Sequence, residues 1–110
     1  MMRSAEFDAT VKNGVRAVQR DIVLHVRRDS EPDGPRFGLI VSKRVGSAVE
    51  RHRVSRRLRH VAREVVGELN PGDRVVIRAL PTSAGASSQA FRRQLSAGIG
   101  RVFSSMSGKR

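Results

Sequence analysis

The residues with the clearest chemical potential are the basic side chains that crowd positions 43 to 63. Arginine presents its N–H donors in a fork that matches two phosphate oxygens at once. The block contains Lys43, Arg44, Arg51, His52, Arg53, Arg56, Arg57, Arg59 and Arg63. This density indicates a surface that binds phosphate groups or another polyanion.

The spacing within this block predicts one long helix over residues 47–69, ended by Asn70-Pro71-Gly72. Successive helical residues are about 100° apart, so residues three and four apart share a face. Two opposite faces result: an apolar stripe of Val54, Leu58, Val61 and Val65, and a basic cluster of His52, Arg56, Arg59 and Arg63. The apolar stripe should pack on a core, and the basic cluster should face outward.

The basic cluster calls for a partner outside the chain. Glu50 and Glu64 are the only acids between positions 43 and 66. Like charges four residues apart in a helix repel by about 0.2–0.5 kcal/mol per pair. Nucleic acid fits best as the compensating partner. A membrane surface also carries negative charge, but the apolar face is needed for the core. A helix that reads DNA bases fits less well, because the segment lacks Asn and Gln.

The charge is unevenly distributed along the chain, whose net charge is +12 over 110 residues. Residues 1–34 carry six basic and six acidic side chains, residues 35–66 carry nine and two, and residues 67–110 carry seven and two. Nineteen of the 22 basic residues are arginine. A genome rich in G and C would also favour arginine, but codon bias does not explain the clustering. A polyanion-binding face is therefore predicted outside the first third.

Composition also bounds the class of protein. The chain contains no cysteine, which excludes disulfides and zinc sites built on thiolates. No apolar run approaches the roughly 20 residues that cross a bilayer. Residues 1–8 lack the apolar stretch of a signal peptide. We expect one cytoplasmic domain over residues 1–110, with an ordered core at about residues 4–104.

Turn-forming residues and hydrophobic periodicity divide the rest of the chain into short elements. The first two predicted strands are joined by the exposed turn 28–35 and are expected to form a hairpin. In order, we expect a helix capped by Ser4 and ended by Asn13-Gly14, strands over 20–27 and 36–44, the long helix, a strand over 73–80, and a last helix capped by Ser87 or Ser88 that frays after Ser104.

Alternation gives the two faces of the predicted hairpin different characters. The face that points away from the core mixes apolar, polar and charged residues, among them Val23 and His25. A ligand groove is predicted on this mixed face. The residues predicted to face the core are Ile22, Leu24, Val26, Phe37, Leu39 and Val41, joined by Phe91, Leu95, Ile99, Val102 and Phe103 of the last helix.

Residues 37–64, FGLIVSKRVGSAVERHRVSRRLRHVARE, resemble the signature of the bacterial ribonuclease P protein family. That pattern is a Lys-Lys/Arg pair, a hydrophobic-Gly-x-Ala-Val step, Arg-Asn, and a Lys-Arg-x-x-Arg run. The matching residues are Lys43, Arg44, Gly46, Ala48, Val49, Arg51, Arg53, Arg56 and Arg59. The flanking segments agree in order, so the resemblance extends over residues 6–103.

The chain departs from that pattern at three points. His52 stands where the family usually has asparagine, and Ser55 where it usually has lysine. The ring N–H of His52 can still donate a hydrogen bond to RNA, and Arg57 offsets the charge lost at Ser55. The family usually has a basic arm before the first helix, whereas this chain begins almost at that helix.

The resemblance implies an α+β fold, an α/β sandwich with a left-handed βαβ crossover, although such crossovers are right-handed in about 98% of proteins. It also implies that catalysis resides in an RNA subunit, and that this RNA and the substrate hold the Mg²⁺ ions. No acidic pair has metal-binding spacing, and His25, His52 and His60 have no assignable triad partners. We therefore expect no catalytic residue and no metal site in the protein.

The resemblance further implies two binding surfaces. One contacts the catalytic RNA through its phosphates: Lys43, Arg44, Arg51, His52, Arg53, Arg56, Arg57 and Arg59. The other is a cleft between the first helix and the mixed sheet face, which holds the single-stranded 5′ leader of precursor tRNA: Phe7, Val11, Val23, His25 and Arg44. Phe7 and His25 could stack on leader bases. Alternatively, Phe7 fills the core beneath the helix, and both roles can hold together.

The chain is therefore expected to be the accessory subunit of an endoribonuclease that matures the 5′ end of tRNA. Its expected partners are the catalytic RNA and precursor tRNA, with no membrane and no obligate protein partner. The alternative is a ribosomal or other RNA-binding module without a role in cleavage. Only the ordered motif from Lys43 to Arg59 distinguishes the two.

Overall fold

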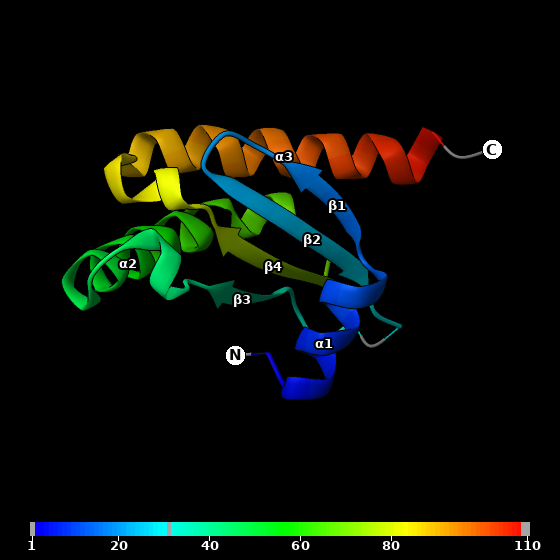
Figure 1. Ribbon diagram of the computed structural model, residues 1–110. Coiled ribbons are helices and arrows are strands. Elements are labelled where there is room, and N and C mark those ends of the chain that lie inside the picture. Colours follow the sequence, from blue (N-terminus) through cyan, green and yellow to red (C-terminus); the bar gives the residue numbers. More distant parts are fainter. Residues whose placement is uncertain (1, 31, 109–110) are drawn as a thin grey trace.

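The chain folds around one mixed sheet. The computed structural model describes residues 2–30 and 32–108. Figure 1 shows α1 and α3 on opposite sides of the sheet, and α2 packs with α3. The predicted α+β fold is confirmed.

Within the described ranges the elements are α1 (Ser4–Asn13), β1 (Val15–Val18), β2 (Ile22–Arg28), β3 (Arg36–Ile40), a 3-10 turn (Lys43–Val45), α2 (Ala48–Val65), a second 3-10 turn (Val66–Glu68), β4 (Asp73–Ala79), a third 3-10 turn (Pro81–Gly85) and α3 (Ser88–Gly108).

The strand order β1-β2-β4-β3 shows that the predicted hairpin of β2 and β3 is wrong. β2 pairs antiparallel with β1 and β4, whereas β3 pairs in parallel with β4. Alternation identifies a strand but does not select its neighbour. The true hairpin partner, β1, was not predicted, because it has four residues and a very tight turn. That turn is closed by the Gln19 N–H, which donates to the Ile22 carbonyl at 2.8 Å.

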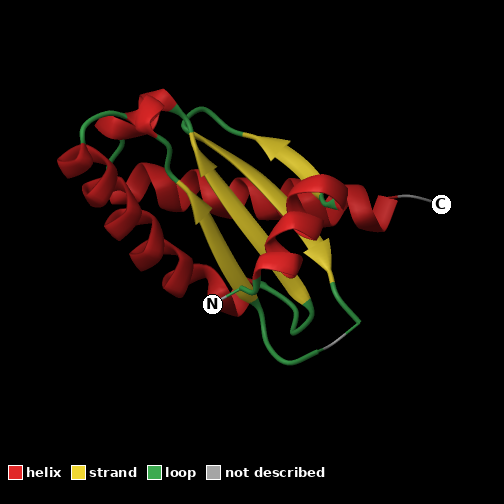
Figure 2. Cartoon of the chain, turned by 60° about the horizontal axis from the view of Figure 1, so that its bottom comes forward, coloured by secondary structure: helices red, strands yellow, loops and turns green. Residues whose placement is uncertain are grey.

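The segment β3–α2–β4 is a βαβ unit, since α2 connects two parallel neighbouring strands (Figure 2). Its left hand stays a prediction from the resemblance. β3 ends at Ile40, four residues earlier than predicted. The chain then turns through Lys43–Val45, where the Ser42 hydroxyl accepts the Arg44 N–H at 3.3 Å. The final residues of the predicted strand therefore belong to a turn.

The core lies between one face of the sheet, here the inner face, and helices α2 and α3. The prediction of both helical stripes is confirmed. Fully or almost fully buried are Ile22, Leu24 and Val26 of β2, Val54, Leu58, Val61 and Val65 of α2, and Phe91, Leu95, Ile99 and Val102 of α3. A Cβ at Gly98 would collide with the Leu24 side chain, so this glycine lets α3 approach β2 closely.

The helix ends differ slightly from the predicted ones. Arg3, not Ser4, is the N-cap of α1, and the Glu6 carboxylate accepts the Arg3 N–H at 3.2 Å. The Ser87 hydroxyl accepts the Ala90 N–H at 3.0 Å ahead of α3. That helix continues to Gly108, past the predicted fraying point. No helix in the described ranges is long and apolar enough to cross a membrane.

Candidate nucleic-acid interface

The outward face of α2 carries most of the predicted RNA-binding residues. His52, Arg56 and Arg59 are exposed. Within the described part of the chain, Arg56 and Arg59 form no hydrogen bond or ion pair. Arg51 is half-buried, and its Nε atom also has no partner among the described residues. The guanidinium groups of Arg56 and Arg59 are therefore available to an external anion.

Two other arginines of α2 also hold the fold together. The Arg57 guanidinium donates to the Ala86 carbonyl at 2.7 Å, and that of Arg53 donates to the Ala84 carbonyl at 3.4 Å. Both side chains are half-buried, and the carbonyls belong to the connection between β4 and α3. Helical spacing places these two arginines beside the basic cluster but does not reveal that they, unlike Arg56 and Arg59, bind the fold. The structure does, because only one pair reaches the neighbouring turn.

The turn before α2 places Lys43 and Arg44, both exposed, beside the first helical turn. Gly46 follows with φ +151°, and a Cβ there would collide with the Glu50 carboxylate. Glu50 accepts the Ser47 N–H at 2.9 Å, and this hydrogen bond lowers the pKa of the Glu50 carboxyl. The acid of the first turn thus serves as a cap and leaves the nearby basic side chains uncompensated.

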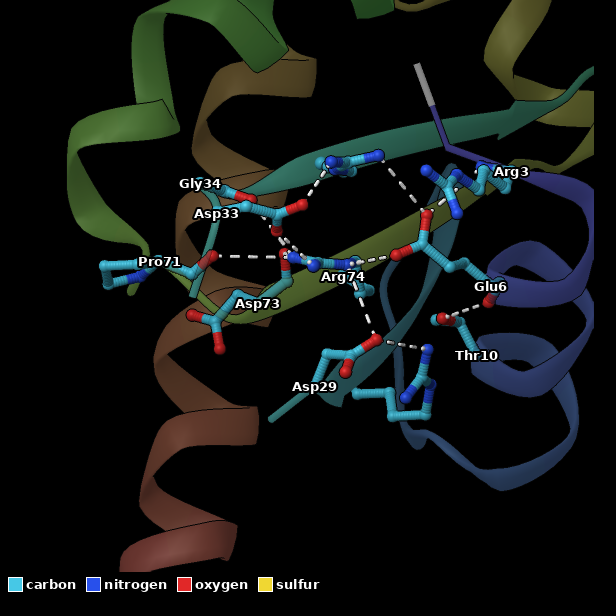
Figure 3. A network of polar contacts seen from close by, with 11 residues as sticks. Arg3, Glu6, Thr10, Asp29, Asp33, Gly34, Pro71, Asp73 and Arg74 are labelled. Carbon is cyan, nitrogen blue, oxygen red and sulfur yellow. Dashed lines mark hydrogen bonds and ion pairs between the residues drawn. The ribbon is translucent and has the colours of Figure 1, made fainter. Parts of the chain in front are cut away.

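Arg74 is the centre of a buried ion network on the outer face of the sheet, where α1 lies (Figure 3). Its side chain is 0% exposed and donates to Glu6 at 2.9 Å and to Asp33 at 2.7 Å. It also donates to the Gly34 carbonyl at 3.0 Å. One guanidinium therefore ties α1, the loop before β3, and β4 together.

Two further arginines beneath α1 are ion-paired. Arg36 pairs with Glu6 at 3.6 Å and also with Asp33, while Arg27 pairs with Asp29 at 3.4 Å. We call this part of the outer face the covered half; its arginines are Arg27, Arg36 and Arg74. Each of them faces a carboxylate of the neutral first third of the chain.

The network shifts the ionisation of its members. A backbone hydrogen bond from Arg3 and the side-chain bond from Arg74 lower the pKa of Glu6. Burial raises the pKa of Asp33, but the hydrogen bonds from Arg74 and from its own backbone, together with the charges of Arg36 and Arg74, outweigh burial, and the pKa is lowered. Burial likewise opposes the charge on Arg74, yet Glu6 and Asp33 raise its pKa. The network is therefore fully charged at neutral pH.

Sequence patterns do not reveal this network, because a basic residue in a strand is normally exposed. A signal was present in the charge distribution. Residues 1–34 hold six of the ten acids of the chain, and Glu6, Asp29 and Asp33 are among them. An acidic cluster in an otherwise basic chain indicates an internal cationic partner.

The predicted leader-binding residues, apart from Arg44, lie on the two elements that meet at the outer face. Phe7 and Val11 on α1 are half-buried, and Val23 on β2 is buried. A Cβ at Gly38 would lie 2.8 Å from two atoms of the Phe7 ring, so Phe7 packs on β3. Arg44 is not on the sheet, since it belongs to the turn before α2.

His25 lies deeper than predicted. It is 6% exposed, so little of its ring is available for stacking. Its Nε2 atom is buried and has no partner among the described residues. Burial lowers the pKa of the imidazole, and the charges of Arg78 and Arg16 lower it further. His25 is therefore neutral at pH 7, in a positive environment.

A groove of about 750 Å³ lies between α1, β3 and α2. Phe7, Phe37 and Leu39 contribute to its apolar lining, and Arg59 and Arg63 to its charged lining. The groove therefore joins the predicted leader surface to the basic face of α2, two regions that the sequence suggested only separately.

Metal ligands are not grouped on this surface. Among the described residues, no set of three or more His, Asp or Glu side chains could hold an ion. The carboxylates Glu6, Asp29 and Asp33 are engaged by arginines instead. That the RNA and the substrate hold the Mg²⁺ ions stays a prediction.

Comparison with known sequences gives one family. The family model described as Ribonuclease P matches residues 1–102. The chain is 65% identical over 99 residues to the ribonuclease P protein component of Mycobacterium avium (strain 104), covering 86% of this chain and 83% of that protein. It is 58% identical over 108 residues to that of Mycobacterium ulcerans (strain Agy99), covering 96% and 90%.

Solved structures share the fold. The RNase P protein of Staphylococcus aureus superposes with a TM-score of 0.79 at 23% identity, covering 94% of this chain and 95% of that one. The RNase P protein of Thermotoga maritima gives a TM-score of 0.76 at 21% identity, covering 87% and 90%. The same arrangement of helices and strands is therefore compatible with very different sequences.

Proposed function

The chain belongs to the ribonuclease P protein family, and from this premise we propose that it binds a catalytic RNA and the 5′ leader of precursor tRNA and assists removal of that leader. The observation that carries the proposal is the exposed basic face of α2. Arg56 and Arg59 there have no partner within the described part of the chain. Phosphate groups would neutralise these charges and release counterions.

The catalytic RNA binds the polybasic surface, which comprises Lys43, Arg44, Arg51, His52, Arg53, Arg56, Arg57 and Arg59. Contacts to phosphates fix the position of the protein on RNA without reading its sequence. Arg53 and Arg57 contribute from a fixed geometry, because both also bind backbone carbonyls. The tether limits their rotamer freedom and so lowers the entropy lost on binding.

The leader binds along the outer face of the sheet and the adjoining groove. In this proposal Phe7 and Val11 on α1 and Val23 and His25 on β2 contact the leader, and Arg44 extends the surface from the turn before α2. The ion pair between Arg74 and Glu6 fixes α1 on the sheet, and the pair between Arg74 and Asp33 fixes the loop before β3. The groove between Phe7 and Arg59 then gives the leader a continuous path to the catalytic RNA.

Bond cleavage itself belongs to the RNA. Mg²⁺ ions held by the RNA and the substrate supply the activated water for phosphodiester hydrolysis. The protein orients the substrate and offsets the repulsion between two polyanions, which lowers the entropic cost of reaching the reactive geometry.

A cleavage assay at low Mg²⁺ tests the proposal. Purified protein added to the cognate catalytic RNA should increase removal of the 5′ leader from precursor tRNA. The R56A/R59A variant should lose this effect and keep the melting temperature of the wild type. Arg101→Ala, an exposed arginine on α3, is the matched control and should behave as wild type. A protein that binds the RNA without changing cleavage would instead be a non-catalytic RNA-binding module.

A further inference from the structure

Two arginines outside the predicted site, Arg16 and Arg78, lie on the outer face of the sheet. In β1, Ala17 is part of the core, so Arg16 next to it points to the other side. In β4, Ile77 and Ala79 are part of the core, so Arg78 between them points outward as well. Both arginines are exposed.

Strand register places both arginines around His25. Arg16 is directly opposite His25 across β1 and β2, and Arg78 is opposite Val23 across β2 and β4. They are two strand spacings, about 10 Å, apart across the sheet and two residues, about 7 Å, apart along it. From these positions two long side chains can reach neighbouring phosphates of one nucleic-acid strand.

The surroundings of these arginines contain no compensating charge. Neither Arg16 nor Arg78 has a hydrogen bond or ion pair with any residue that the structure describes. The other outward residues here are apolar: Val18, which is 50% exposed, Val23 and Ile40. We call these five residues the open half of the outer face. Figure 2 shows that α1 crosses only part of the outer face of the sheet.

His25 gives an independent indication of a ligand. Its side chain is 6% exposed, and Nε2 has no partner in the described ranges. Buried polar atoms in folded proteins are nearly always hydrogen-bonded, so an orphan atom needs an explanation. The positive fields of Arg78 and Arg16 act on this imidazole in addition to its burial. An anion held by the two arginines would neutralise both guanidinium charges and would accept a hydrogen bond from His25 in the tautomer that carries its proton on Nε2.

We propose that Arg16 and Arg78, with His25 between them, form a phosphodiester-binding site for the precursor leader. This inference rests on the proposed function, since it takes the leader to lie on the outer face. The proposed site changes the expected mode of leader binding from base stacking to phosphate contacts. His25 is too buried to stack, Val11 is aliphatic, and Phe7 is packed on Gly38. The leader is therefore held mainly by its phosphates and with little regard to base sequence.

Equilibrium binding of the reconstituted holoenzyme tests the site. Precursor tRNA and mature tRNA are titrated over a series of KCl concentrations with wild type, R16Q, R78Q and the double variant. Each change should weaken precursor binding by about three- to tenfold, as expected for the loss of one ordinary hydrogen bond. The double variant should make the salt dependence shallower by about 1.4 units, since each single-strand phosphate contact contributes about 0.7. Mature tRNA affinity should not change.

Three companion variants make the outcome decisive. R16K/R78K keeps both charges and should keep the salt slope. Arg101→Ala lies on the other side of the sheet and should leave both affinities unchanged. Phe7→Leu probes the leader surface without changing the arginines.

Loss of precursor affinity in Phe7→Leu, but none in R16Q/R78Q, overturns the phosphate site and leaves the proposed function intact. A wild-type holoenzyme that binds precursor and mature tRNA equally overturns leader binding itself. Equal losses for both RNAs in R16Q/R78Q would place the arginines on the tRNA body.

Discussion

The covered and open halves of the outer sheet face use the same residue type in opposite ways. Under α1, Arg27, Arg36 and Arg74 are all paired with carboxylates. Beyond α1, Arg16 and Arg78 have no partner among the described residues. The outward direction and the type of side chain are the same in both halves, and Arg74 and Arg78 lie on the same strand, β4. The nearest acidic residue, and not the position in a strand, therefore decides whether an arginine stabilises the fold or is left for a ligand.

The largest effect should come from Arg74→Ala. It removes a fully buried side chain with its hydrogen bonds to Glu6, Asp33 and the Gly34 carbonyl, and breaking this network should lower the free energy of unfolding by about 3 kcal/mol. Arg78→Ala, two residues further along β4, should change it by less than about 0.5 kcal/mol. Urea unfolding of the two variants measures the difference. Similar losses of unfolding free energy in the two variants would show that arginines of the covered and open halves contribute equally to stability.

Gly38→Ala tests the boundary between the halves, where Phe7 packs on β3. The new methyl group would lie 2.8 Å from the Phe7 ring, and such overpacking costs about 1–3 kcal/mol. Gly100→Ala is the control, because a Cβ there meets nothing within 4 Å. It should stabilise α3 by up to about 1 kcal/mol. Thermal melts of the two variants should therefore shift in opposite directions.

The same distinction should hold on α2. Arg57→Ala removes the hydrogen bond to the Ala86 carbonyl and should cost about 0.5–1.5 kcal/mol. Arg56→Ala should stay within about 0.5 kcal/mol of wild type. Each should make the salt dependence of binding to the catalytic RNA shallower by about one unit. Urea unfolding and filter binding measure the two quantities. If Arg56→Ala is as destabilising as Arg57→Ala, the tether to Ala86 is not what distinguishes them.

The smallest effect concerns pH. His25 has a folded-state pKa below 6.5, so in the range just below 6.5 the unfolded chain binds more protons than the folded one. The free energy of unfolding should therefore fall as the pH drops below 6.5. Glu6 and Asp33, whose pKa values are also lowered, contribute their loss only in more acidic solution. Urea midpoints at about pH 7.5 and about pH 5.5 measure the change, and His25→Gln should flatten it.

The sequence predicted what periodicity and local chemistry determine. The two faces of α2 follow from a 3.6-residue repeat, and their apolar residues Val54, Leu58, Val61 and Val65 are all buried. The start of α2 was also predicted, since the predicted helix begins at Ser47, which is the N-cap of the observed one. These features depend on residues within a few positions of one another.

What the sequence did not predict depends on distant residues. The pairing of β2 with β4 brings together Leu24 and Ile77, and no local pattern encodes that register. Arg74 is buried because acids from two other segments surround it, which composition signals only in aggregate. The burial of His25 likewise depends on its neighbours across the sheet, Arg16 of β1 and Val76 of β4. Side chains whose role depends on such long-range neighbours are the ones that sequence patterns misplace.

The strand order has a consequence for how the chain acquires its structure. Arg28 and Asp73, which face each other across β2 and β4, are 45 residues apart in sequence. Pairing across such a separation requires a costly loop closure and slows folding. A ribosome adds about 5–20 residues per second, so β2 is exposed for a few seconds before β4 emerges. A two-stranded hairpin is at best marginally stable alone. We therefore expect nascent chains that stop before β4 to remain unfolded, with the apolar side of β2 open to aggregation or to chaperones.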